Sequence, residues 1–322
     1  KLKGSLAALD PDLPFDLKLS WPGLNWPLHK PAEDEPSYQL KKGSLTAKGA
    51  LSGYQFALNT SGQGTDVPPF KLALKGKGDL GQLSNIDLLL NALKGELKLD
   101  GKLAWQKGVQ WQGVTSFKGI DPAELVPEIK GTLAGRVESE FQLSDAGHWQ
   151  LKVPALKVDG KLNKYPLAIT GQLSGDDAMN WQIPAFALQT GPNKLQAKGK
   201  LTEKLWQLDA QLAAPDLSGL YPGLRGDLSG TLALGGNQQA PRVNAALSST
   251  RLFYAGTDLK GIVLKGNGVI GEVPAGKLAL TVANLTQGST LLKQIKLDAD
   301  GDLGRHQLSL DMKGDPLAAN LR

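Results

Sequence analysis

The chain has 322 residues, a net charge of +5 and a hydrophobic content of 41%, while aromatic residues make up only 6%. It contains no cysteine, which excludes disulfides, thiolate metal sites and a cysteine nucleophile. Lysines alternate with acids and form no basic cluster interleaved with aromatics, so the charges predict a solvated surface and no nucleic-acid partner.

Alternation of apolar and polar residues is the main structural signal of the chain. It predicts strands that each have one apolar and one charged face. In chain order, the clearest examples lie at 15–19, 95–105, 137–143, 195–201, 295–303 and 308–314. Prolines and acids interrupt the pattern at 26–36, and glycines and prolines interrupt it at 62–69, so both segments are predicted to be loops.

A longer repeat lies in the middle of the chain. Residues 121–135 align with residues 216–230 at an offset of 95, with matching Asp, Leu, Pro and Gly positions. Aspartate caps helix starts and proline ends helical turns, so we expect short helices near 122–126 and 217–221.

Two smaller motifs also recur. Glycine two residues before leucine marks many of the expected strands, and interior glycines predict bends or bulges that let a sheet curl. Tryptophan followed by glutamine occurs at 105, 111, 149, 181 and 206, which indicates equivalent places in successive hairpins.

Together these elements predict an all-β fold, in which a long, curled antiparallel sheet forms an elongated groove with an apolar interior and a few short helices. No composition shift divides the chain, so we expect 1–322 to be one continuous, repetitive β-groove segment of a longer protein. No run is apolar enough for a membrane helix, so any anchor is expected outside the segment. Roughly 20 strands at about 4.8 Å each would give a groove on the order of 100 Å long.

Several motifs resemble catalytic or ligand-binding sites, but the structure expected around each of them does not suit such a site. The glycine pattern at 76–81 suggests a dinucleotide loop, and 271–277 suggests a phosphate loop, but each is followed by an expected strand where the motif needs a helix. The aspartates of 298–302 alternate along a strand and lack the spacing of a calcium loop. The three histidines lie far apart in sequence. We therefore expect no enzyme activity, metal or cofactor.

The candidate binding residues are those on the apolar faces of the expected strands, where they would line the groove and contact acyl chains. They are Leu97, Leu99, Leu103, Trp105, Leu133, Val137, Phe141, Leu195, Leu201, Leu228, Leu232, Ile295, Leu297, Leu303, Leu308 and Leu310.

The glycine–leucine strands, the paired elements at 121–135 and 216–230, and the Trp-Gln repeats resemble the TamB family, within the AsmA-like group of bridge-like lipid-transfer proteins. The resemblance spans essentially the whole chain. The chain is similar to the repetitive middle region of the proteins of that family. The resemblance implies a β-groove in the periplasm, an inner-membrane anchor outside this segment, and an outer-membrane barrel partner, TamA, engaged through other regions. The family has no catalytic residues to carry over.

Three functions remain open from the sequence. A hydrophobic conduit for phospholipid between the inner and outer membranes accounts best for an uncovered apolar face. A scaffold or chaperone for outer-membrane protein assembly, autotransporters among them, is the alternative. An outer-membrane barrel or a β-solenoid adhesin is less well supported, because a barrel needs aromatic girdles and a solenoid needs a tighter repeat.

Overall fold

The structure is a computed structural model that describes residues 1–29, 35–272, 274–315 and 319–321. Across these residues, 24 strands form one antiparallel sheet that is not closed, and helix is limited to two short turns. This confirms the predicted all-β antiparallel fold. The chain divides into two units, Lys1–Gly160 and Lys161–Arg322, and each is described by itself.

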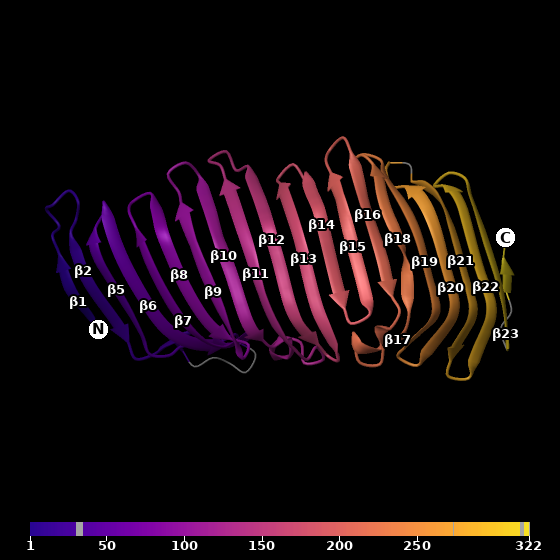
Figure 1. Cartoon of the computed structure of the whole chain (residues 1–322), viewed down its shortest axis with the longest axis horizontal. Coiled ribbons are helices and arrows are strands. Elements are labelled where there is room, and N and C mark those ends of the chain that lie inside the picture. The colour runs from indigo at the N-terminus through magenta and orange to yellow at the C-terminus, as the bar shows by residue number, and fades with distance from the viewer. Residues whose placement is uncertain (30–34, 273, 316–318, 322) are drawn as a thin grey trace. The chain divides into compact units, whose positions relative to one another are not determined.

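Unit 1 contains the first eleven strands, one short helix and most of the twelfth strand (Figure 1). Their bounds are β1 (Leu2–Leu6), β2 (Phe15–Trp21), β3 (Leu24–Trp26), β4 (Tyr38–Leu40), β5 (Gly43–Ala50), β6 (Gly53–Gly64), β7 (Val67–Gly78), β8 (Gln82–Ala92), β9 (Gly95–Ala104), β10 (Val109–Ile120), η1 (Pro122–Glu124), β11 (Gly131–Leu143) and β12 (Trp149–Leu162). The strands pair in the order β1–β2–β5–β6–β7–β8–β9–β10–β11, and β4 pairs with both β3 and the end of β6.

Unit 2 repeats this arrangement of long hairpins. Its elements are β13 (Tyr165–Asp176), β14 (Trp181–Thr190), β15 (Asn193–Leu201), β16 (Trp206–Ala214), η2 (Leu217–Gly219), β17 (Arg225–Gly226), β18 (Leu228–Gly236), β19 (Pro241–Tyr254), β20 (Thr257–Val269), β21 (Ala275–Gln287), β22 (Thr290–Asp302), β23 (His306–Asp315) and β24 (Ala319–Leu321). Pairing follows chain order, except that β18 pairs with β16 and the two-residue β17 pairs with β19.

Recurring glycines on the apolar face lie beneath aromatic rings of neighbouring residues. The three atoms nearest to a Cβ at Gly76 all belong to the ring of Phe56 on the adjacent strand, and those nearest to a Cβ at Gly43 belong to the ring of Trp21. An aromatic ring that covers a cross-strand glycine restores the packing that glycine lacks. Gly43 belongs to the glycine–leucine motif, so at this position the motif reflects ring packing in addition to the bends expected from the sequence.

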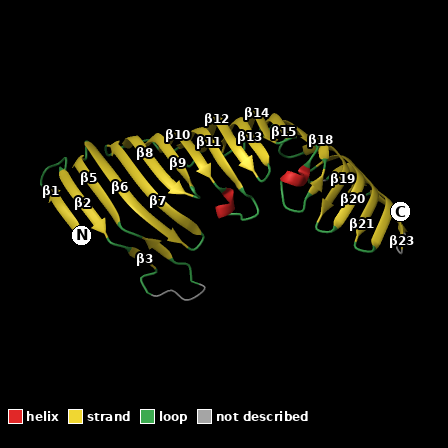
Figure 2. Ribbon diagram, turned by 60° about the horizontal axis from the view of Figure 1, so that its bottom comes forward, coloured by secondary structure: helices red, strands yellow, loops and turns green. Residues whose placement is uncertain are grey.

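The two short helices are single 3-10 turns that fall within the ranges 122–126 and 217–221 (Figure 2). Asp121 caps the first by accepting a hydrogen bond from the Ala123 amide, and Asp216 caps the second through the Ser218 amide. The remaining residues of each range form an irregular turn. Among the described residues, no helix has the length and apolar character needed to cross a membrane.

The prediction of a loop at 62–69 is wrong. Strand β6 continues to Gly64 and β7 begins at Val67, so only a two-residue turn separates them. Pro68 and Pro69 are tolerated because they lie at a register shift in the β6–β7 pair, and β8 pairs with β7 only from Lys71 onwards. Of the loop predicted at 26–36, Trp26 ends β3, and residues 30–34 lie outside the described residues.

Candidate apolar binding face

The candidate residues of unit 1 share one face of the sheet. Leu99 on β9 is paired in register with Leu88 on β8 and with Thr115 on β10, and Thr115 is paired with Val137 on β11. Strand parity places the other candidates on the same face: Leu97 and Leu103 on β9, and Leu133 and Phe141 on β11.

One polar pair on this part of the face is bonded within the sheet. Trp111 is paired in register with Leu103 and Phe141, and its indole N–H donates to the Ser139 hydroxyl on β11 at 3.0 Å. The indole donor therefore has its partner within the sheet, which favours contact with an apolar ligand.

Trp105 lies at the margin of this face, just beyond the end of β9. Its indole N–H donates to the Leu80 carbonyl at 2.7 Å, and its backbone amide donates to Gly81 at 2.9 Å. The ring is 40% exposed. The structure thus holds Trp105 against the β7–β8 turn, outside the strands that form the face.

The candidates of unit 2 also lie on one face. Successive strands place a leucine in a single row from β15 to β23, interrupted once by glycine: Leu195, Leu212, Gly230, Leu247, Leu264, Leu280, Leu297 and Leu310. The other candidates on this face are Leu201, Leu228, Leu232, Ile295 and Leu308. Leu303 follows the end of β22 and is 73% exposed, so it lies beyond the strands.

The opposite face carries the charges. Lys98, Asp100 and Lys102 alternate with the leucines of β9 and are exposed. In unit 2, Lys277 lies 2.8 Å from Asp300 across the β21–β22 pair, and this ion pair raises the pKa of Lys277. Such exposed pairs contribute little stability, but they keep this side of the sheet in water.

In the described part of the chain, no second layer of strands or helices covers the apolar face. Only five apolar side chains are classed as buried among the described residues, and no large side chain is fully buried. The accessible surface is 20359 Å² for a chain of 34.1 kDa. A compact monomer of this mass would expose about 12800 Å². Much of the apolar face therefore remains open.

The most deeply buried side chains of unit 2 include a group that lies beside η2. Asn193 is 3% exposed, and its amide group exchanges two hydrogen bonds with the backbone of Asp216, at 2.7 and 3.0 Å. Hydrogen bonds from Ser218 and the Tyr165 hydroxyl lower the pKa of Asp216 to about 2. Leu217 is buried here as well. This network fixes the turn to the strand ends and marks one margin of the face.

Sequence reasoning missed several residues on the same face. Leu58, Leu74 and Leu88 form a row on β6, β7 and β8, and Ile86 is among the most buried residues at 8% exposure. The alternation in residues 54–60 and 70–76 was the signal that could have found the first two. In residues 88–90, three consecutive leucines conceal which of them point to the apolar face. The register shows that Leu89 is paired with Lys98 and therefore lies on the charged face.

Comparisons with known proteins place this chain among related sequences. A family model described as TamB, N-terminal domain, matches residues 1–322, whereas the sequence resemblance indicated the middle region. The translocation and assembly module subunit TamB of Haemophilus influenzae is 28% identical over 288 residues, which cover 88% of this chain and 22% of the relative. An uncharacterised protein of Buchnera aphidicola is 20% identical over 321 residues, which cover 100% of this chain and 31% of the relative.

The chain thus spans less than a third of the length of either relative. No solved structure matches it. Because the family model covers every residue, the chain belongs to the TamB family.

Proposed function

We propose that this chain is a segment of a periplasmic conduit whose apolar face holds the acyl chains of phospholipids as they pass between the inner and outer membranes. The segment is not an enzyme in this proposal. Its membrane anchor, and the contact with the outer-membrane barrel protein TamA, belong to regions outside 1–322. The observation that carries the proposal is the open apolar face, continuous in register within each unit.

The chemistry of this face favours acyl chains over polypeptide. The backbone groups of the inner strands are already paired within the sheet, so a polypeptide lying on the apolar face would find few partners for its own N–H and C=O groups. An acyl chain has no such groups. Aliphatic side chains such as Leu88, Leu99 and Leu280 present only carbon to it.

Energetics also fit transport. Each buried methylene contributes about 0.8 kcal/mol relative to water, so a chain of sixteen carbons would gain about 12 kcal/mol if fully covered. A lipid that comes from a bilayer leaves a similar apolar environment, so the net change is small. A near-neutral exchange allows lipid to enter and leave the face.

The alternative is a scaffold or chaperone for outer-membrane protein assembly. The printed name of the Haemophilus relative, a translocation and assembly module subunit, supports it. In this role an unfolded strand would have to reach an unpaired sheet edge, where backbone hydrogen bonds are available.

Native mass spectrometry of the gently purified 322-residue chain tests the proposal. We expect one or more phospholipids bound per monomer, because the apolar face is otherwise exposed to water. Delipidated protein should take up added phospholipid again. A chain that carries no lipid or detergent and takes up none would contradict the conduit.

A further inference from the structure

The tip of the first long hairpin in unit 1 differs from the rest of the sheet. Strands β3 and β4 extend the β2–β5 hairpin with unchanged register, because Trp21 is paired with Gly43 and Leu24 with Leu40. Beyond this point β4 pairs with the end of β6. We define the hairpin tip as residues 24–28 and 37–40.

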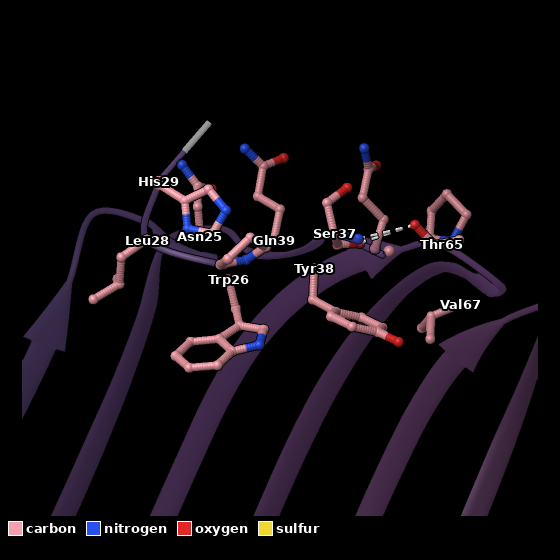
Figure 3. A pocket seen from close by; sticks show the side chains of 13 residues that line it. Asn25, Trp26, Leu28, His29, Ser37, Tyr38, Gln39, Thr65 and Val67 are labelled. Atoms are coloured by element: carbon pink, nitrogen blue, oxygen red, sulfur yellow. Dashed lines mark hydrogen bonds between the residues drawn. The ribbon is translucent and has the colours of Figure 1, made fainter. Parts of the chain in front are cut away.

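One side of the hairpin tip is apolar and exposed. Trp26 and Tyr38 are paired in register and are 66% and 44% exposed, and their rings lie on the same side of the strands (Figure 3). Leu24 and Leu40 form the next row, also exposed. Because β4 pairs with β6 and β6 pairs with β7, this row is in register with Phe70 on β7. The tip therefore extends the apolar face of unit 1.

The other side of the hairpin tip is polar but uncharged. Asn25 and Gln39 point away from the two rings (Figure 3). The rings and these two amides all line a hollow of about 850 Å³, to which His29 also contributes. This contrasts with β9, where a charged residue alternates with each leucine. Among the described residues, the charges nearest in sequence to the tip or to the end of β6 are Lys41 and Lys42 at the base of the hairpin, and Glu35 and Asp66 in the adjoining loops; Glu35 lies 3.0 Å from the imidazole of His29.

We propose that the hairpin tip docks on the surface of a phospholipid bilayer, with Trp26 and Tyr38 at the level of the headgroups. Tryptophan and tyrosine favour this level because each has an apolar ring and one polar atom. The absence of charge within β3 and β4 removes the main cost of entering the interface. In the part of the chain that the structure describes, two lysines and two acids flank the tip, and this balance fits a mainly zwitterionic surface.

This inference deepens the proposed function and rests on it: lipid that reaches the apolar face has to come from a bilayer, and the tip is an exposed extension of that face. A protein partner is the other occupant of such a surface. The experiment separates the two.

Flotation with vesicles of phosphatidylethanolamine and phosphatidylglycerol at 3:1 tests the docking. The 322-residue chain should float with the vesicles, and the double variant Trp26→Ser/Tyr38→Ser should partition at least ten-fold less. The variant Trp26→Phe/Tyr38→Phe should retain most of the binding. Because all these side chains are exposed, the fold should survive, which circular dichroism checks.

The matched control is Leu125→Ser/Val126→Ser, which removes two exposed apolar side chains elsewhere in unit 1 and should float like the wild type. Native mass spectrometry separates this inference from the proposed function. The tip variant should keep its bound lipid, whereas Leu99→Arg should carry less bound lipid and still float. Failure of the wild type to float, equal flotation of the serine tip variant, or an equal loss in the control would overturn bilayer docking. Equal flotation would point to a protein partner.

Discussion

Leu99→Arg is expected to abolish lipid binding at this level of unit 1 while the chain remains folded. Its register partners are Leu88 and Thr115, and neither offers a negative charge. An arginine covered by acyl chains without a partner costs at least several kcal/mol. In the full-length protein, one blocked level should stop passage along the whole conduit. We therefore expect loss of function at near-normal abundance, measured by complementation of a strain that lacks the protein and by immunoblot.

The matched control is Lys98→Glu, one residue away on the charged face. Lys98 is exposed and lies 3.7 Å from Glu96, so the change places two acids near each other in water. Like charges at an exposed site cost well under about 1 kcal/mol. This variant should complement fully. Full activity of Leu99→Arg would mean that the face carries no cargo at this level.

Gly76→Val is expected to destabilise unit 1 by about 1–3 kcal/mol, the usual cost of overpacking. The three atoms nearest to a Cβ at Gly76 all belong to the ring of Phe56. In a Phe56→Ala background the same change should cost less than about 0.5 kcal/mol, since the ring is gone and valine favours strands. Hydrogen exchange of the amides in β6, β7 and β8 measures both values.

Gly53→Val is the control for this double-mutant cycle. Gly53 begins β6, and a side chain there would meet no atom within 4 Å. It should leave the exchange of the same amides unchanged. An equal cost for Gly76→Val with and without Phe56 would show that the glycine is required by the backbone instead of by the ring.

Strand parity explains how much the sequence could predict. Within β9, alternation alone places Leu97 and Leu99 on one face and Lys98 on the other, because side chains in a strand point to alternate sides. Local alternation survives in most strands, so the all-β fold and the shared face of most candidates were predictable. That this face binds lipid stays a prediction.

Register shifts and strand ends limited how far side-chain positions could be predicted from the sequence. The shift between Gly62 and Gly64 brings Val67 onto the apolar row, which simple counting along β7 cannot give. Trp105 and Leu303 continue the pattern in sequence but lie past the ends of their strands. The rings over Gly43 and Gly76 depend on pairing with a neighbouring strand, so a single-strand pattern does not reveal them.

The central claim, that the apolar face contacts lipid, is tested most directly by a photo-crosslinking amino acid placed at neighbouring positions in cells. We expect probes at Leu99 in unit 1 and Leu280 in unit 2 to capture phospholipid, whereas probes at Lys98 and Thr281 on the opposite face should not. Equal lipid capture at the two positions of each pair, or none at Leu99 and Leu280, would contradict it.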